Sequence, residues 1–74
     1  MLVAYMVTED ENDTDDNDLR PVYGITARMG EEVSTVRDIS ADRSEVEAIA
    51  RLLEREQLHP IHLYDVISDL IGRF

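Results

Sequence analysis

The residues most able to do chemistry are carboxylates gathered in one short segment. Residues 9–18 hold seven of the chain's 17 carboxylates and no lysine or arginine: Glu9, Asp10, Glu11, Asp13, Asp15, Asp16 and Asp18. Such a run is repelled by nucleic acid phosphates and by anionic lipid, and it attracts cationic protein surfaces. We therefore expect these seven carboxylates to bind a protein partner, with no direct contact to nucleic acid or membrane.

Three interpretations of this acidic segment are open. It is a solvated loop that only raises solubility, a calcium loop, or a mimic of nucleic acid charge that occupies a cationic groove. Asp13, Asp15 and Asn17 have the spacing of the first three ligands of a calcium loop. However, Asp18 and Gly24 stand where that motif has its glycine and its final glutamate. We therefore expect no metal ion and no cofactor.

A second group of candidate residues lies near the C-terminus. His62, Asp65 and Asp69 fall along one side of an expected helix and could together ligate a divalent metal. The simpler interpretation places Asp65 on the solvent side of that helix. His59 precedes Pro60, so we expect it to cap or pack at the start of the helix.

Asp38 and Ser40 are a third pair with potential chemistry, as an acid and a nucleophile. No histidine lies near them in the sequence, and both residue types are common where a chain turns into a helix. The sequence also lacks a glycine-rich phosphate loop. We expect no catalytic residue and no enzymatic activity.

The size of the chain limits what it can enclose. Its 74 residues carry a net charge of −10 and no cysteine, so neither disulfides nor zinc thiolates support the fold. We expect one domain over residues 1–74, with a small core. No apolar run reaches the roughly 20 residues that span a bilayer. The first residues lack a basic leader and a cleavage pattern, so we expect the cytoplasm of a bacterial or phage-infected cell.

Three strands are expected in the first half of the chain. Residues 2–8 are apolar on both faces, which predicts a strand at a central or well-covered position rather than an exposed edge. Residues 9–18 are expected to form a loop. Residues 20–29 alternate between apolar and polar side chains and predict a second strand. A two-residue turn at Gly30 and Glu31 leads to a third strand over residues 32–38. This turn predicts the pairs Met29–Glu32, Ala27–Ser34 and Ile25–Val36.

The first of two expected helices follows residue 42. Its apolar positions recur at helical spacing, at Val46, Ile49, Ala50 and Leu53. Two N-caps are compatible with the sequence, either Ser44 with Glu47 or Asp42 with Glu45. The helix is expected to end near Gln57 or Leu58.

The second expected helix runs from Pro60 to about Ile71, because proline suits a first helical turn and Gly72 suits a helix end. Its apolar stripe comprises Leu63, Val66, Ile67, Leu70, Ile71 and Phe74. A short linker predicts an antiparallel helix hairpin. The expected fold is α+β, a three-stranded antiparallel sheet covered by a C-terminal antiparallel helix hairpin in the order βββαα.

Several short motifs are spaced along the chain. They are Tyr23-Gly24-Ile25, Asp38-Ile39-Ser40, and a C-terminal pattern of Leu58, Pro60, His62, Leu63, Asp65, Val66 and Asp69. This combination resembles a group of small uncharacterised bacterial proteins with a YGI strand, a DIS step and an L-x-P-x-HL-x-DV-x-x-D helix. The resemblance covers residues 20–70 and implies the same element order. It implies no activity, and the acidic segment lies outside it.

Two functions from different classes are consistent with these patterns. The first is a non-enzymatic acidic regulator, of the anti-CRISPR or other anti-defence type carried by a phage or mobile element. It would bind a nucleic-acid-handling protein through residues 9–18 by mimicking nucleic acid charge. The alternative is a housekeeping interaction module or homodimer with no such mimicry, in which Ile61, Tyr64 and Ile71 bury against a partner.

Overall fold

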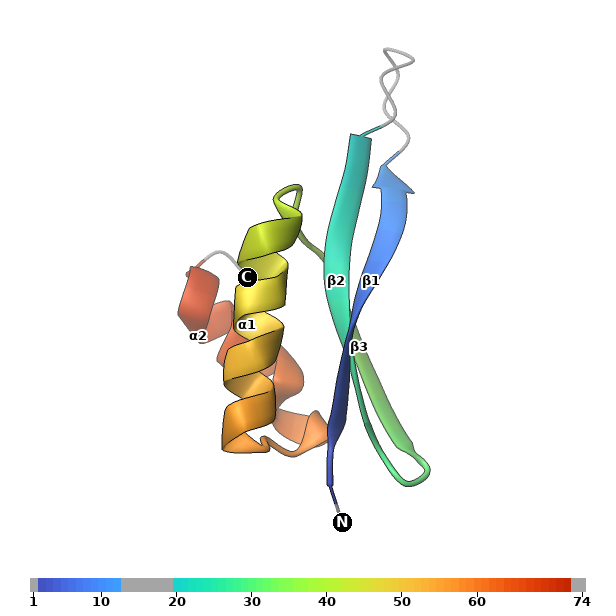
Figure 1. The fold of residues 1–74 in the computed structure, drawn as a ribbon, viewed down its shortest axis with the longest axis vertical. Helices are drawn as coiled ribbons and strands as arrows, with labels where there is room; N and C mark the ends of the chain where they lie inside the picture. Colours follow the sequence, from blue (N-terminus) through green and yellow to red (C-terminus); the bar gives the residue numbers. More distant parts are fainter. Residues whose placement is uncertain (1, 13–19, 73–74) are drawn as a thin grey trace.

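The computed structural model describes residues 2–12 and 20–72, with side chains given for residues 2–10 and 21–72. Its elements are β1 (Ala4–Asn12), β2 (Arg20–Met29), β3 (Glu32–Ser40), α1 (Arg43–Glu56), a short 3-10 helix η1 (Pro60–His62) and α2 (Leu63–Ile71). The three strands form one antiparallel sheet, and both helices lie on the same side of it (Figure 1). The predicted α+β class and βββαα order are confirmed.

β2 is the central strand, because the sheet order is β1-β2-β3. The prediction that the first strand takes a central or well-covered position rather than an exposed edge is therefore wrong. On one face of this first strand, Val3 belongs to the core, and Tyr5 and Val7 pack against it. Leu2 and Met6 are 82% and 63% exposed on the opposite face. The first strand is apolar on both faces, although only one of them is covered by the described residues.

The β2–β3 turn sets the register of the sheet as the sequence predicts. Gly30 has a φ of 63°, which suits glycine at the first central position of a tight hairpin turn. The Met29–Glu32, Ala27–Ser34 and Ile25–Val36 pairs are all present.

β3 continues to Ser40 rather than leaving the sheet near Asp38, which corrects the predicted boundary. The pairs Tyr23–Ser40 and Ile25–Val36 enclose one residue of β2 and three of β3, so β3 carries two extra residues. Asp38 adopts a left-handed φ of 59° in this bulge. As a result Asp38 is exposed and Ile39, which follows it, is only 3% exposed and lies in the core.

Gly24 faces this bulge and makes it possible. A Cβ atom at position 24 would lie 2.3 Å from the carbonyl oxygen of Val36 and 3.0 Å from the Cα of Arg37. Real Cβ atoms do not approach backbone so closely, and only glycine allows the two chains to meet here. The Tyr23-Gly24-Ile25 and Asp38-Ile39-Ser40 motifs are therefore two sides of one contact.

α1 begins at a cap that the sequence left undecided. Asp42 is the N-cap, and its carboxylate accepts a hydrogen bond from the backbone N–H of Ser44 at 3.0 Å. The predicted buried face is confirmed, with Val46, Ile49, Ala50 and Leu53 in the core. The helix ends at Gln57, which has a left-handed φ of 51°.

The second helical segment starts as η1 and continues as α2, which ends at Gly72 with a φ of 65°. Leu63 and Ile67 are fully buried, but Leu70 is 47% exposed. The apolar stripe is therefore narrower than the sequence predicts, and Phe74 lies outside the described residues. The buried core takes residues from β2, β3, α1 and α2: Ile25, Ala27, Val36, Ile39, Val46, Ile49, Ala50, Leu53, Leu63 and Ile67, together with Val3.

Candidate functional site

The start of the acidic segment is a strand rather than a loop. Residues 9–12 form the end of β1 and pair with residues 20–23 of β2. This corrects the predicted loop boundary for Glu9, Asp10 and Glu11. Aspartate and glutamate disfavour strands, but pairing with a neighbouring strand overrides that weak preference. Asp13, Asp15, Asp16 and Asp18 lie outside the described residues, as does the calcium-loop alternative that depends on them.

The strand conformation divides the carboxylates between the two faces of the sheet. Because successive side chains of a strand point to opposite faces, Glu9 lies on the same face as Val7, and Asp10 lies on the face of Met6. These residues are at the far end of the sheet from the N-terminus and the β2–β3 turn, and β2 and the end of β1 reach beyond the first turn of α1 (Figure 1). The acidic end of β1 thus extends past the helical layer (Figure 1).

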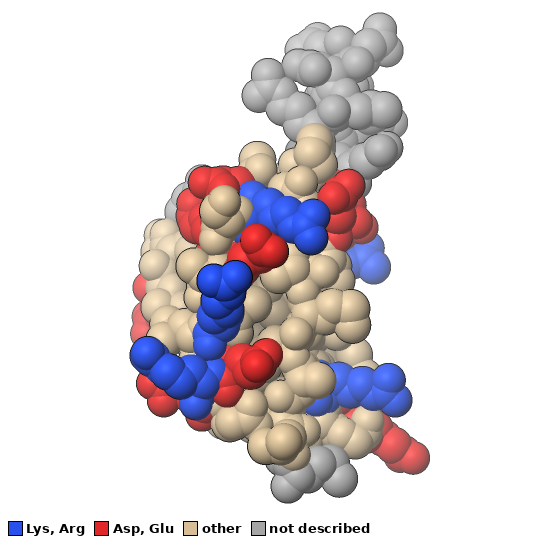
Figure 2. All heavy atoms as spheres, viewed as in Figure 1, with Lys and Arg blue, Asp and Glu red and all other residues tan. Residues whose placement is uncertain are grey.

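The surface of the helical side has a different charge pattern. Red and blue atoms are interleaved over the face seen in Figure 2. Two exposed ion pairs contribute, Arg43 with Glu47 at 3.6 Å and Arg55 with Glu56 at 3.8 Å. The Arg43 guanidinium also lies 5.9 Å from the centre of the Tyr23 ring. Residues 19–74 contain seven arginines against ten carboxylates, so most of the excess negative charge belongs to residues 9–18.

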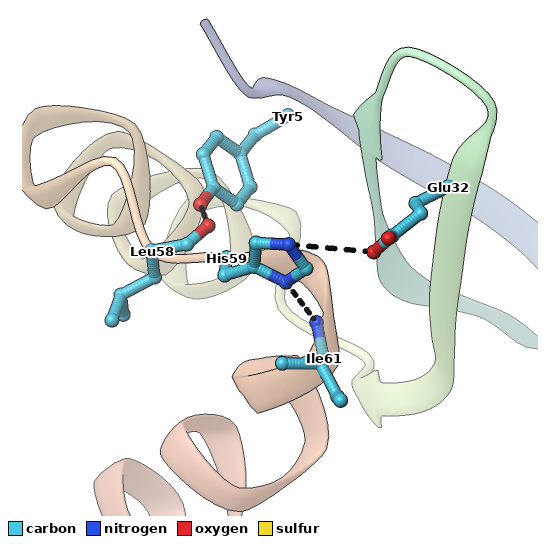
Figure 3. Close-up of polar contacts among 5 residues, drawn as sticks. All are labelled: Tyr5, Glu32, Leu58, His59 and Ile61. Carbon is cyan, nitrogen blue, oxygen red and sulfur yellow. Dashed lines mark hydrogen bonds and ion pairs between the residues drawn. The ribbon is translucent and has the colours of Figure 1, made fainter. Parts of the chain in front are cut away.

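The end of α1 is joined to the beginning of the sheet by polar contacts. The N–H of Val3 donates to Oε1 of Gln57 at 2.9 Å, and Nε2 of Gln57 donates to the carbonyl of Val3 at 3.2 Å. The hydroxyl of Tyr5 donates to the carbonyl of Leu58 (Figure 3). Burial raises the pKa of Tyr5, and the negative charge of Glu54 raises it further. These contacts fix β1 against the α1–η1 connection.

His59 is a structural residue at the start of η1, as the sequence predicts. Its Nδ1 accepts a hydrogen bond from the N–H of Ile61 at 3.2 Å, and its Nε2 lies 3.4 Å from a carboxylate oxygen of Glu32 (Figure 3). Because Nδ1 accepts, the neutral ring carries its proton on Nε2, toward Glu32. His59 thereby connects η1 to the start of β3.

The remaining candidate residues do not assemble a site. Within the described ranges, no three histidine, aspartate or glutamate side chains are placed to hold one metal ion, so His62, Asp65 and Asp69 are not brought together as ligands. The Ser40 hydroxyl accepts from the N–H of Asp42 at 3.0 Å, which is a turn contact before α1. Sequence reasoning missed Gln57, whose place after an amphipathic helix indicated only a helix end.

Among the residues with described side chains, exposed apolar groups occur on the outer face of the sheet and on the η1–α2 segment. Leu2, Met6 and Val33 are on the sheet face opposite the core, and Val33 is 59% exposed. Ile61 and Tyr64, predicted as partner-facing, are also exposed, on η1 and α2. Ile71, predicted with them, instead packs against the core. No helix in the described part of the chain is long and apolar enough to cross a membrane.

Comparison with known proteins assigns the chain to a family. Residues 1–73 match the model of a family of unknown function, DUF6514. No curated protein and no solved structure matches the chain. The match covers nearly the whole chain, including the acidic segment that the sequence motifs left out.

Proposed function

The chain belongs to the family of unknown function DUF6514, and we propose that it is a non-enzymatic regulator that binds a cationic protein through residues 9–18. The partner class is a nucleic-acid-handling protein, such as a nuclease of a defence system, whose groove is built for phosphates. The acidic segment would enter that groove in place of nucleic acid. A phage or mobile element is the proposed origin of such an inhibitor.

One observation carries this proposal. Residues 9–18 hold seven carboxylates and no cation, and Glu9 and Asp10 lie at the end of the sheet that extends past the helical layer. Around α1, by contrast, carboxylates alternate with arginines. A charged surface steers a partner best when its charge is of one sign and accessible, because the fields of mixed charges largely cancel one another. Salt also screens exposed charges over about 8 Å at physiological ionic strength.

The test is a competition assay with a purified DNA-binding nuclease and a labelled DNA duplex. In the test variant the seven carboxylates of residues 9–18 become Asn or Gln. The matched control neutralises seven carboxylates elsewhere: Glu31, Glu45, Glu47, Glu54, Glu56, Asp65 and Asp69. Both variants change the net charge equally, and the control keeps the Asp42 cap.

We expect the wild-type chain and the control to displace DNA at low salt. Their affinity for the nuclease, calculated from the competition with the DNA affinity measured at each salt concentration, should fall at least tenfold between 50 and 300 mM salt, because exposed charges are screened. The variant at residues 9–18 should not displace DNA. Equal competition by the two variants, or competition that salt does not weaken, would contradict the proposal.

The alternative is an interaction module or homodimer without mimicry. The exposed Ile61 and Tyr64 support it, since exposed apolar side chains that are close together in the chain can form a surface for a partner. Light scattering across a hundredfold concentration range distinguishes the two functions. A dimer that Tyr64→Asp converts to a monomer supports the alternative, and a monomer at every concentration argues against it.

A further inference from the structure

The outer edge of β1 is the less protected of the two edges of the sheet. β1 pairs with β2 in one continuous register of nine residue pairs, and it contains no proline. β3, at the other edge, contains the bulge at Asp38. Proteins commonly blunt an exposed edge with a bulge or proline, because unpaired main-chain groups accept another strand. The β1 edge has neither device.

The β2–β3 turn determines which main-chain groups of β1 face outward. A two-residue turn makes its flanking residues, Met29 and Glu32, exchange hydrogen bonds, so the main-chain groups of Met29 face β3. Those of the preceding residue, Arg28, then face β1, where Arg28 pairs with Ala4. By the alternation of an antiparallel strand, the main-chain groups that face away from β2 are those of Val3, Tyr5, Val7, Glu9 and Glu11.

The contact between Val3 and Gln57 supports this assignment independently. Both main-chain groups of Val3 bond to the side-chain amide of Gln57, in the reciprocal manner of a peptide unit in a neighbouring strand. The side-chain amide of Gln57 thus already occupies this edge at Val3. Among the described residues, no main-chain group outside the sheet bonds to the main chain of Val7 or Glu9.

The side chains along this edge specify its occupant. Glu9 and Asp10 place negative charge at one end, while Ala4 and Met6 are exposed at the other. Opposite charges on neighbouring strands stabilise their pairing, and like charges oppose it. A second copy would bring another chain of net charge −10 and no complementary basic run. The complementary occupant is a strand that is basic at one end and apolar at the other.

We propose that the outer edge of β1 binds an extended basic segment of a partner protein as a fourth strand of the sheet. This rests on the proposed function, since it specifies how the acidic end of β1 holds a cationic partner. Main-chain hydrogen bonds to Tyr5, Val7 and Glu9 supply the pairing, and carboxylates at the strand end select arginine or lysine.

The test uses a synthetic nine-residue peptide. Six of its residues alternate between threonine and valine, and the last three are arginines. A second peptide has the same sequence and charge, but its threonine–valine stretch is N-methylated and cannot donate main-chain hydrogen bonds. Fluorescence anisotropy measures both affinities. We expect the methylated peptide to bind at least tenfold more weakly. Equal affinities would overturn strand addition and leave the proposed function intact.

A matched pair of protein variants tests the same edge. Glu9→Thr and Glu9→Pro both remove the carboxylate, but only Glu9→Pro also removes the outward N–H, a change that a strand edge tolerates. Circular dichroism checks that each variant is folded. We expect Glu9→Pro to bind the unmethylated peptide at least fivefold more weakly than Glu9→Thr. Equal binding by the two variants, or no binding of this peptide to the wild type, would overturn the inference.

Two further outcomes separate the inference from related ideas. A wild-type dimer that Glu9→Pro abolishes and Glu9→Thr preserves would assign the edge to a second copy and overturn the inference. The proposed function is judged separately, by the competition assay with the folded nuclease. Failure of that assay together with methylation-sensitive peptide binding would reject nucleic acid mimicry and retain strand addition.

Discussion

Gly24→Ala should be among the most damaging single substitutions of this fold. The added methyl would lie 2.3 Å from the carbonyl oxygen of Val36, 3.0 Å from the Cα of Arg37 and 3.2 Å from the Oγ1 of Thr8. Two of these neighbours are backbone atoms, so the β3 bulge itself must move. That movement would also displace Ile39, which is 3% exposed.

The expected cost follows from overpacking in a small domain. Forcing a methyl group into a closed contact costs about 1–3 kcal/mol, and we expect about 3 kcal/mol because the bulge cannot yield as a side chain would. A domain of this length has a total stability of about 4–11 kcal/mol, so the loss is a large fraction of it. Urea unfolding followed by circular dichroism measures the difference.

Gly72→Ala is the matched control. Gly72 has a φ of 65°, but a Cβ atom there would meet nothing within 4 Å. The control reports only the strain of a left-handed alanine, about 1–2 kcal/mol. A Gly24→Ala variant whose free energy of unfolding lies within about 0.5 kcal/mol of the wild type, the scale of a neutral surface substitution, would refute the close contact between β2 and β3.

Three further substitutions test other contacts. Tyr5→Phe removes the hydrogen bond to the carbonyl of Leu58 and should lower the free energy of unfolding by about 1 kcal/mol at pH 7. Because the folded pKa of Tyr5 is raised, the stabilisation from its hydroxyl is full below the ordinary pKa of about 10 and is lost as the pH rises through the folded pKa. The difference in unfolding free energy between variant and wild type should therefore shrink in alkaline unfolding titrations. His59→Ala removes the acceptor for the N–H of Ile61 and should lower the free energy of unfolding, measured by thermal unfolding, by about 1 kcal/mol. His59→Asn keeps an acceptor and should lower it by less than half as much, so equal losses of stability in the two variants would argue against the cap. Thr8→Val removes a buried hydroxyl that has no partner among the described residues and should raise the unfolding free energy by about 1 kcal/mol, and a loss instead would indicate an unseen partner.

The sequence predicted those features that local rules decide. Gly30 required a tight turn, and that turn fixed the register of Ile25 against Val36 without any knowledge of the third dimension. The spacing of Val46 and Leu53 similarly defined the buried face of α1. In both cases the deciding interactions lie within a few residues.

The features that were mispredicted depend on partners distant in the sequence. Glu9 favours a loop by its own preference and becomes a strand residue because Tyr23 pairs with it. The bulge at Asp38 required knowing that Gly24 faces it, although a glycine inside a strand pattern is itself a signal for a bulge. The edge position of β1 was missed because its apolar residues on both faces suggested that both are covered.

The candidate site was predicted only in part. The charge of residues 9–18 was plain from composition, but composition carries no orientation. The outward direction of the Glu9 main chain follows from the turn at Gly30 and from the contact between Val3 and Gln57. That contact joins residues 54 positions apart, so no local pattern could have revealed it.

The central claim is that a cationic partner binds at the acidic end of β1, and amide NMR during titration with the arginine-ended peptide tests it most directly. The account predicts that the largest shift changes fall on residues 5–12, with new protection from solvent exchange at Val7 and Glu9. Amides of α2 and η1 should stay unchanged. Shift changes centred on Ile61 and Tyr64, with β1 unaffected, would contradict the account.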